Sequence, residues 1–143
     1  MKPFRFGLEK ILNLRKYTEA EAKIELGRAI GILTEIENHI FEVVQERMRA
    51  AAWQFEPGNN SVQIQQYTFY LLRLDNTKEQ LLKEAAQAEL IVEKAREAFM
   101  EASRERKVLD KLKEKQQKEN RKENFISEIK ILDDTSANSS RRD

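Results

Sequence analysis

The feature that most constrains this chain is a stripe of residues that recurs at alternating steps of four and three along one long stretch. Its members are apolar or aromatic, apart from two charged ones: Tyr67, Leu71, Leu74, Lys78, Leu81, Ala85, Ala88, Val92, Ala95, Phe99, Ala102, Arg106 and Leu109. A repeat that averages 3.5 residues keeps one face toward a partner helix only if the two helices supercoil. The stripe therefore predicts a coiled-coil helix that needs a second helix to cover it.

One segment of the chain is suited to reversing its direction. Residues 56–61 read EPGNNS, and proline, glycine and asparagine in this order favour a turn. Asn60 is placed to cap the following helix, with Gln63 as its capping-box partner. The sequence thus predicts a helix over about 5–54, a turn at 56–61 and a second helix over about 61–123. The first helix contains Gly27 and Gly31, and each costs about 1 kcal/mol relative to alanine, so we expect other parts of the fold to support them.

The first helix carries a stripe of the same spacing, which reads Val43, Ile40, Ile36, Leu33, Ala29, Leu26 and Ala22 in reverse. Paired in order with the second stripe, Val43 lies opposite Leu74 and Ala22 lies opposite Ala95. The same rule carries on to Leu12 with Arg106 and Leu8 with Leu109, and it leaves the turn in the middle. The predicted fold is all-α, a long antiparallel two-helix coiled-coil hairpin, whose helices approach closely where Ala29 faces Ala88.

Composition limits the function classes. Charged residues make up 36% of the chain with a net charge of only +1, which argues against a role dominated by nucleic-acid phosphates or an anionic membrane surface. No apolar run is long enough to cross a bilayer, and the start lacks a signal-peptide core, so we expect a cytoplasmic protein. The absence of cysteine removes disulfides and thiol chemistry from consideration.

Two regions depart from the regular stripe. Around the turn the apolar set broadens beyond what two helices can bury between them, which predicts a local cap or a docking patch: Phe41, Val44, Trp53, Phe55, Ile64, Phe69, Tyr70 and Leu72. Between Arg104 and Lys122 there are nine basic residues and four acidic ones. We assign residues 1–124 to the hairpin and expect 125–143 to hold a short apolar cluster followed by a disordered tail.

No residue pattern points to catalysis, a cofactor, a metal or a small-molecule substrate. His39 is the only histidine and has no partner at helical spacing that would make a nucleophilic or metal site. Acidic residues mostly have Lys or Arg three or four positions away, as expected for a solvated helix surface. The basic segment from Arg104 leaves nucleic-acid binding as a minor alternative, because it is diluted by glutamate and lacks aromatics.

Three segments together resemble a known family. They are FRFGLEKILNLRKYTEAEAKIELGRA at 4–29, YTFYLLRL at 67–74 and EASRERKVLDKLKEKQQKE at 101–119. Their order and spacing are similar to those of the flagellar export protein FliJ. The resemblance implies a non-enzymatic part of the flagellar type III export apparatus, built like the central stalk of rotary ATPases and peripherally associated with the inner membrane. It also implies three partners: the export ATPase ring, the cytoplasmic domain of the export-gate membrane protein, and export chaperones.

The resemblance further suggests which residues serve each partner. The gate-binding surface would use Tyr70 and Leu74 with Phe69 beside them, and His39 and Val43 from the first helix. The end that enters the ATPase ring would use residues near both termini: Leu8, Leu12, Arg106, Leu109 and Lys113. The alternative function is a general cytoplasmic coiled-coil scaffold or escort protein that has no ATPase partner.

Overall fold

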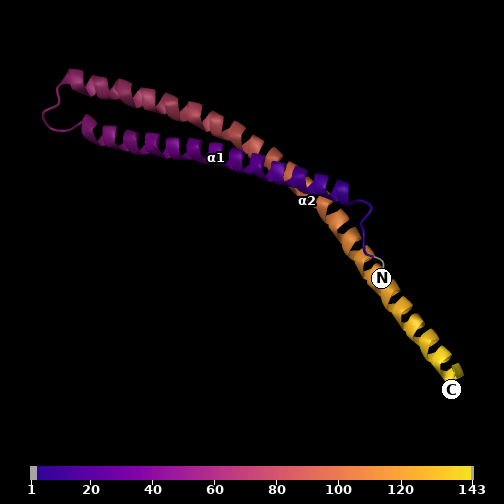
Figure 1. The fold of residues 1–143 in the computed structure, drawn as a ribbon. Coiled ribbons are helices and arrows are strands. Elements are labelled where there is room, and N and C mark those ends of the chain that lie inside the picture. The colour runs from indigo at the N-terminus through magenta and orange to yellow at the C-terminus, as the bar shows by residue number, and fades with distance from the viewer. Residues whose placement is uncertain (1–2, 143) are drawn as a thin grey trace. The chain divides into compact units, whose positions relative to one another are not determined.

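The computed structural model describes residues 3–142 and consists of two helices, with no strand among those residues. Helix α1 runs from Glu9 to Gln54 and helix α2 from Ser61 to Arg142. They form a helical hairpin, with the turn at one end of the paired part (Figure 1). The all-α hairpin predicted from the two stripes is confirmed.

The chain divides into two units. The turn unit comprises Ala22–Phe99, and the terminal unit combines Met1–Glu21 with Met100–Asp143. In the turn unit the predicted stripe is the core: Ala29, Val43, Ala50, Leu81, Ala85, Ala88 and Val92 are buried. The other stripe positions there are half-buried, while most positions between them are exposed. The 3.5-residue spacing therefore identified the buried face of both helices correctly.

The pairing of residues across this core differs from the expected one. Gln54 Nε2 donates a hydrogen bond to Thr68 Oγ1 at 2.7 Å, and Arg47 bonds the carboxylate of Asp75. The expected pairing placed residues 63–64 and 70–71 at these levels, so α2 is advanced by about one helical turn. In an antiparallel pair of helices, each level of the seam combines two different kinds of stripe residue. One kind is followed by the next stripe residue three positions later, and the other kind is preceded by a stripe residue three positions earlier. The expected pairing had placed residues of the same kind opposite each other.

A register that satisfies these bonds changes which side chains meet in the seam. It places Ala22 opposite Phe99, Leu26 opposite Ala95 and Ala29 opposite Val92. Each of these three levels then combines a small side chain with a larger one, which fills the space between the helices evenly. The Ala–Ala pairs predicted for the middle of the hairpin are therefore not formed in this register.

The ends of both helices also differ from the sequence prediction. Helix α1 begins at Glu9 rather than near residue 5, because Phe6 is buried and its carbonyl accepts the Glu9 amide in a turn. Helix α2 continues to Arg142, beyond the end expected near 123 and through the described part of the segment for which we expected a disordered tail. After Gly58 no proline or glycine interrupts the chain, and the hydroxyls of Thr135 and Ser140 bond carbonyls one turn back.

The two helical glycines lack the neighbours that we expected. A β-carbon built on Gly27 or Gly31 meets no atom within 4 Å, and both residues are exposed. Neither is needed for a positive φ angle, because only Gly58 has one. These glycines therefore cost helix stability with no compensating contact in the hairpin.

We predict that Gly27→Ala and Gly31→Ala each raise the free energy of unfolding by about 1 kcal/mol, since alanine loses less backbone entropy in a helix. Thermal denaturation followed by circular dichroism checks this. An unchanged or lowered stability of both variants would mean that the glycines have contacts in the folded chain. Gly58→Ala serves as the control and should destabilise, because φ is 99° there.

The register can be tested with cysteine pairs, since the natural chain has none. We expect Ala29→Cys with Val92→Cys to form a disulfide readily on mild oxidation, because the two residues lie at one level. The pair Ala29→Cys with Ala88→Cys, which the sequence had favoured, should cross-link far more slowly. Mass spectrometry of the oxidised chains measures how fast each disulfide forms. Faster cross-linking of the Ala29 and Ala88 positions would support the pairing expected from the sequence.

Candidate protein interaction surfaces

The turn is held by side-chain bonds to the ends of both helices. Asn59 Nδ2 donates to the Trp53 carbonyl at 2.8 Å and to the Gln54 carbonyl at 3.2 Å, which satisfies acceptors left free at the end of α1. The predicted capping box is confirmed at the start of α2. The Gln63 amide donates to Asn60 Oδ1 and the Asn60 amide to Gln63 Oε1, both at 2.9 Å. These hydrogen bonds therefore fix the positions of the residues next to the turn.

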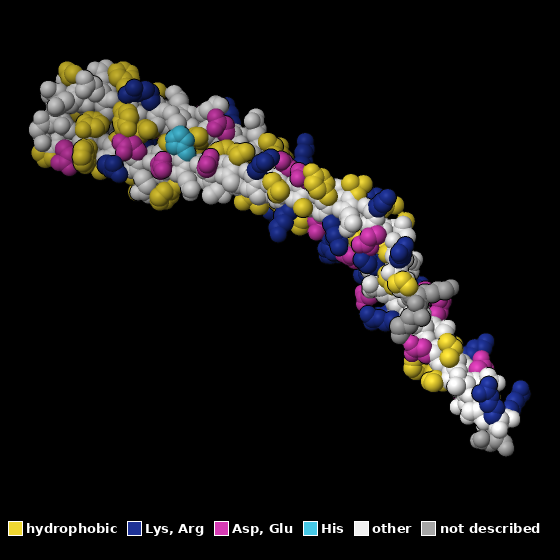
Figure 2. Space-filling view, in the orientation of Figure 1, with side chains coloured by type: hydrophobic (Ala, Val, Ile, Leu, Met, Phe, Trp, Pro, Cys, Tyr) yellow, Lys and Arg dark blue, Asp and Glu magenta, His cyan; other side chains and the backbone are white. Residues whose placement is uncertain are grey.

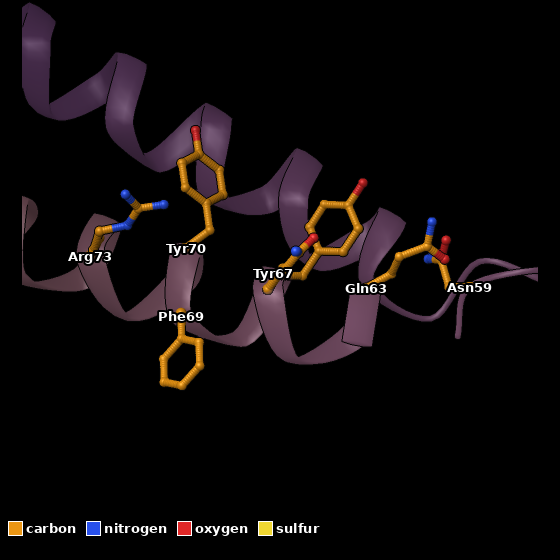
Figure 3. A pocket seen from close by; sticks show the side chains of 7 residues that line it. Asn59, Gln63, Tyr67, Phe69, Tyr70 and Arg73 are labelled. Atoms are coloured by element: carbon orange, nitrogen blue, oxygen red, sulfur yellow. The ribbon is translucent and has the colours of Figure 1, made fainter. Parts of the chain in front are cut away.

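A shallow groove of about 530 Å³ lies on the first turns of α2, next to this turn. Its lining is polar and aromatic: Asn59, Gln63, Gln66, Tyr67, Phe69, Tyr70 and Arg73. Figure 3 shows the rings of Tyr67 and Tyr70 directed toward α1, whereas the ring of Phe69 points away from it. Phe69 is 60% exposed although it is a large apolar side chain, so it is free to contact another protein.

Tyr70 is fixed in place by two charged neighbours. Its hydroxyl donates a hydrogen bond to Glu46 Oε1 on α1 at 2.9 Å, and the Arg73 guanidinium lies 5.6 Å from its ring centroid. The bond to Glu46 raises the pKa of Tyr70, because ionisation would place two negative charges together. Tyr70 is thus an ordered, half-buried residue with one ring face at the surface.

The other residues expected at the gate-binding surface have different degrees of exposure. His39 is exposed on α1, and the histidine is visible on the face shown in Figure 2. Leu74 is half-buried, and Val43 is 7% exposed within the seam. Val43 can therefore pack behind such a surface, but it exposes little area for a partner to contact.

A second apolar stripe lies on the outside of α1. Phe41, Met48 and Phe55 follow each other at seven-residue spacing, and each is more than 60% exposed. The sequence analysis included both phenylalanines in the apolar set near the turn but missed Met48. The seven-residue spacing itself was the available signal, because it places all three on one side of a helix.

The terminal unit is joined by ion pairs between the two helices. Arg15 bonds Glu105 at 2.6 Å, and Lys113 bonds Glu9 at 2.9 Å. Arg106 bonds both Glu19 on α1, at 2.7 Å, and Asp110 on its own helix. The side chains of Arg106 and Glu19 are only 26% and 22% exposed, so this charged cluster sits at the edge of the seam.

These bonds explain the charged position of Arg106 in the predicted stripe. The bond to Arg106 lowers the pKa of Glu19, and the two carboxylates raise the pKa of Arg106. Arg106 and Lys113 are therefore engaged within the hairpin, and they present only part of their charge to a partner. Leu12 is fully buried and Leu109 half-buried, whereas Leu8 is 36% exposed.

The residues before α1 lie along α2 in the same unit. Phe4, Arg5 and Phe6 line a groove of about 440 Å³ together with Glu9, Lys113 and Gln117. Phe6 is buried there, and Arg5 is exposed. The aromatic residues at the start of the chain thus contribute to packing, a role that the sequence prediction of a helix from residue 5 had missed.

The described residues carry no catalytic constellation. Over 3–142 no group of three or more His, Cys, Asp or Glu side chains could hold a metal ion. No helix within that range is long and apolar enough to span a membrane. The side chains of Lys and Arg are interspersed with those of Asp and Glu on the face in Figure 2.

These features define a class of protein: a long helical hairpin with exposed surfaces suited to protein contacts. The family model described as flagellar FliJ protein matches residues 4–143, and the chain therefore belongs to the FliJ family. This family is a non-enzymatic component of flagellar protein export. Comparison with curated proteins and with solved structures finds no match.

The charged cluster predicts a pH dependence of stability. The folded-state pKa of Glu19 lies below the ordinary glutamate value of 4.5, so its bond with Arg106 contributes fully above that pH. The contribution is lost as the pH falls through the lowered pKa, because protonation removes the negative charge.

We expect Glu19→Gln to lower the melting temperature above pH 4.5 and to reduce its fall on further acidification. Melting temperatures measured by circular dichroism across this range check the prediction. Glu25→Gln is the matched control, since Glu25 is exposed and pairs only with Arg28 on its own helix. If both variants show the same acid profile, the Glu19 bond does not contribute.

Proposed function

We propose that this chain couples the flagellar export ATPase ring to the cytoplasmic domain of the export-gate membrane protein, and that it binds export chaperones. It does so as a helical hairpin that supplies surfaces and performs no chemistry. The observation that carries the proposal is the contrast between the two units within one FliJ-family chain. The turn unit presents an aromatic groove, and the terminal unit presents an ion-paired, basic surface.

The turn unit supports contact with the export gate. Tyr70 is held in position by Glu46, and Phe69 leaves an apolar ring exposed beside it. Ordered aromatic residues of this kind often dominate binding energy, because little conformational entropy is lost on association. His39 adds an exposed polar group from α1, while Leu74 and Val43 pack beneath the surface.

The terminal unit supports contact with the ATPase ring. Its exposed surface is rich in lysine and arginine between Arg104 and Lys122, and the ion pairs of Arg106 and Lys113 hold α1 against α2. Leu8 is the partly exposed apolar residue of the expected set, whereas Leu12 and Leu109 stabilise the seam. With these partners, the chain would work at the cytoplasmic face of the inner membrane, at the base of the flagellum.

We expect Tyr70→Ala to weaken binding to the cytoplasmic domain of the export gate by at least tenfold, because it removes the ordered ring and releases Glu46. Isothermal titration calorimetry with the purified gate domain measures the affinity. Tyr17→Ala is the control, since it removes the ring of an exposed tyrosine that belongs to the terminal unit. The assignment fails if Tyr70→Ala and the wild type bind equally.

The ATPase contact separates this proposal from the alternative, a scaffold or escort protein without an ATPase partner. We expect the wild type to promote ring assembly and ATP hydrolysis when mixed with the export ATPase. The variant that combines Glu9→Lys with Lys113→Glu keeps an ion pair at this site and reverses the charge at each position.

That double variant should melt like the wild type and stimulate the ATPase less. Glu25→Arg combined with Arg28→Glu is the control, because it reverses an ion pair outside the terminal unit. If the wild type itself leaves ring assembly and hydrolysis unchanged, the scaffold reading is favoured.

A further inference from the structure

The last part of α2 is a helix with nothing packed against it. From Phe125 to Arg142 every residue is exposed, and we refer to residues 121–142 as the C-terminal extension. This segment contains five large apolar side chains with exposures between 43% and 66%: Phe125, Ile126, Ile129, Ile131 and Leu132. A helix gains most of its stability from packing an apolar face, and the DDTSANSS stretch that follows contains poor helix formers. The extension therefore needs a partner.

Four of the five apolar residues share one face of the extension. Phe125, Ile129 and Leu132 follow at steps of four and three, and Ile126 lies beside Phe125. Ile131 lies on the opposite side of the helix. The face is about two turns long, since its apolar residues run from Phe125 to Leu132, with Lys122 before them and Ser136 after them at the same spacing.

We propose that this face binds the same face of a second copy of the chain, with the two extensions antiparallel. In this arrangement Phe125 lies level with Ile129 of the second copy, and Ile126 meets Ile126 of the second copy at the two-fold axis. One contact surface then serves both copies, as in most homodimers. The side chains at the centre of this contact between the two copies are all apolar.

Charge supports a second copy in this orientation. Lys122 lies on the apolar face at its beginning, and Asp133 lies beside the face near its end. Antiparallel pairing brings each Lys122 next to Asp133 of the other copy, whereas parallel pairing would bring the two Lys122 side chains together. The hairpin already contains the same kind of contact, since Arg47 lies in the seam and bonds Asp75 just beside it.

The arrangement also sets a limit on affinity. Glu128 lies near the two-fold axis on the other flank, where it faces Glu128 of the second copy. This like-charge contact opposes association, and the apolar face is short. The dimer should therefore be reversible, with a dimer fraction that rises with protein concentration.

Sedimentation velocity of the full chain over a wide range of concentration tests the proposal. We expect a monomer–dimer equilibrium, at least tenfold weaker in Ile129→Asp and unchanged in Ile131→Asp, which places the same charge on the opposite side. The melting temperature of dilute protein should be the same for both variants, because both residues are exposed in the monomer. A wild type that stays monomeric throughout overturns the proposal, as does equal weakening by the two variants.

Charge reversal and cross-linking test the orientation. Lys122→Asp should weaken the dimer, and adding Asp133→Lys should restore it. Ile126→Cys should form a disulfide-linked dimer on oxidation, whereas Ser136→Cys should not, because the two Ser136 residues lie far from each other. Efficient cross-linking at both positions would indicate parallel pairing and contradict the proposed contact.

Discussion

The packing of α1 against α2 along one seam is the interaction on which the rest of this fold depends. A two-helix hairpin has no second layer, so most apolar residues outside the seam remain in contact with solvent. The buried set is correspondingly small, and alanine supplies much of it. The stability of the hairpin must come from close packing of the side chains of the two stripes. The pairing of small side chains with larger ones contributes to this packing.

In the terminal unit, charged residues take the place of some apolar residues between the two helices. Its stripe contains Arg106, and Glu19 occupies a stripe position on α1. Such groups are costly to bury, yet here they bond each other while their ends remain partly hydrated. The chemistry of the residues between the helices therefore differs between the two units. That change leaves the aromatic surface and the charged surface in different units, as the proposed coupling function would require.

The sequence predicted the helices, the turn, its capping box and the buried face of each helix, because spacing and turn chemistry are local properties. The register, meaning which residue of α2 lies opposite each residue of α1, is not a local property. It depends on how steps of three and four interleave when one helix is reversed, and the side-chain bonds of Gln54 and Arg47 reveal it. The course of residues 3–8 was missed for a related reason, since the burial of Phe6 depends on its packing in the folded chain. Of the candidate surfaces, the exposure of Phe69 was foreseen, whereas the bond between Tyr70 and Glu46 was not.

The separation in sequence of residues that meet across the seam increases steadily away from the turn. Gln54 and Thr68 are 14 positions apart, whereas Glu9 and Lys113 are 104 apart. Closing a longer loop costs more conformational entropy, so contacts near the turn form most readily and bring the next pair within reach. Folding of this hairpin should therefore proceed like a zipper from the turn outward. The ion pairs of the terminal unit then form last, and their release is the first step of unfolding.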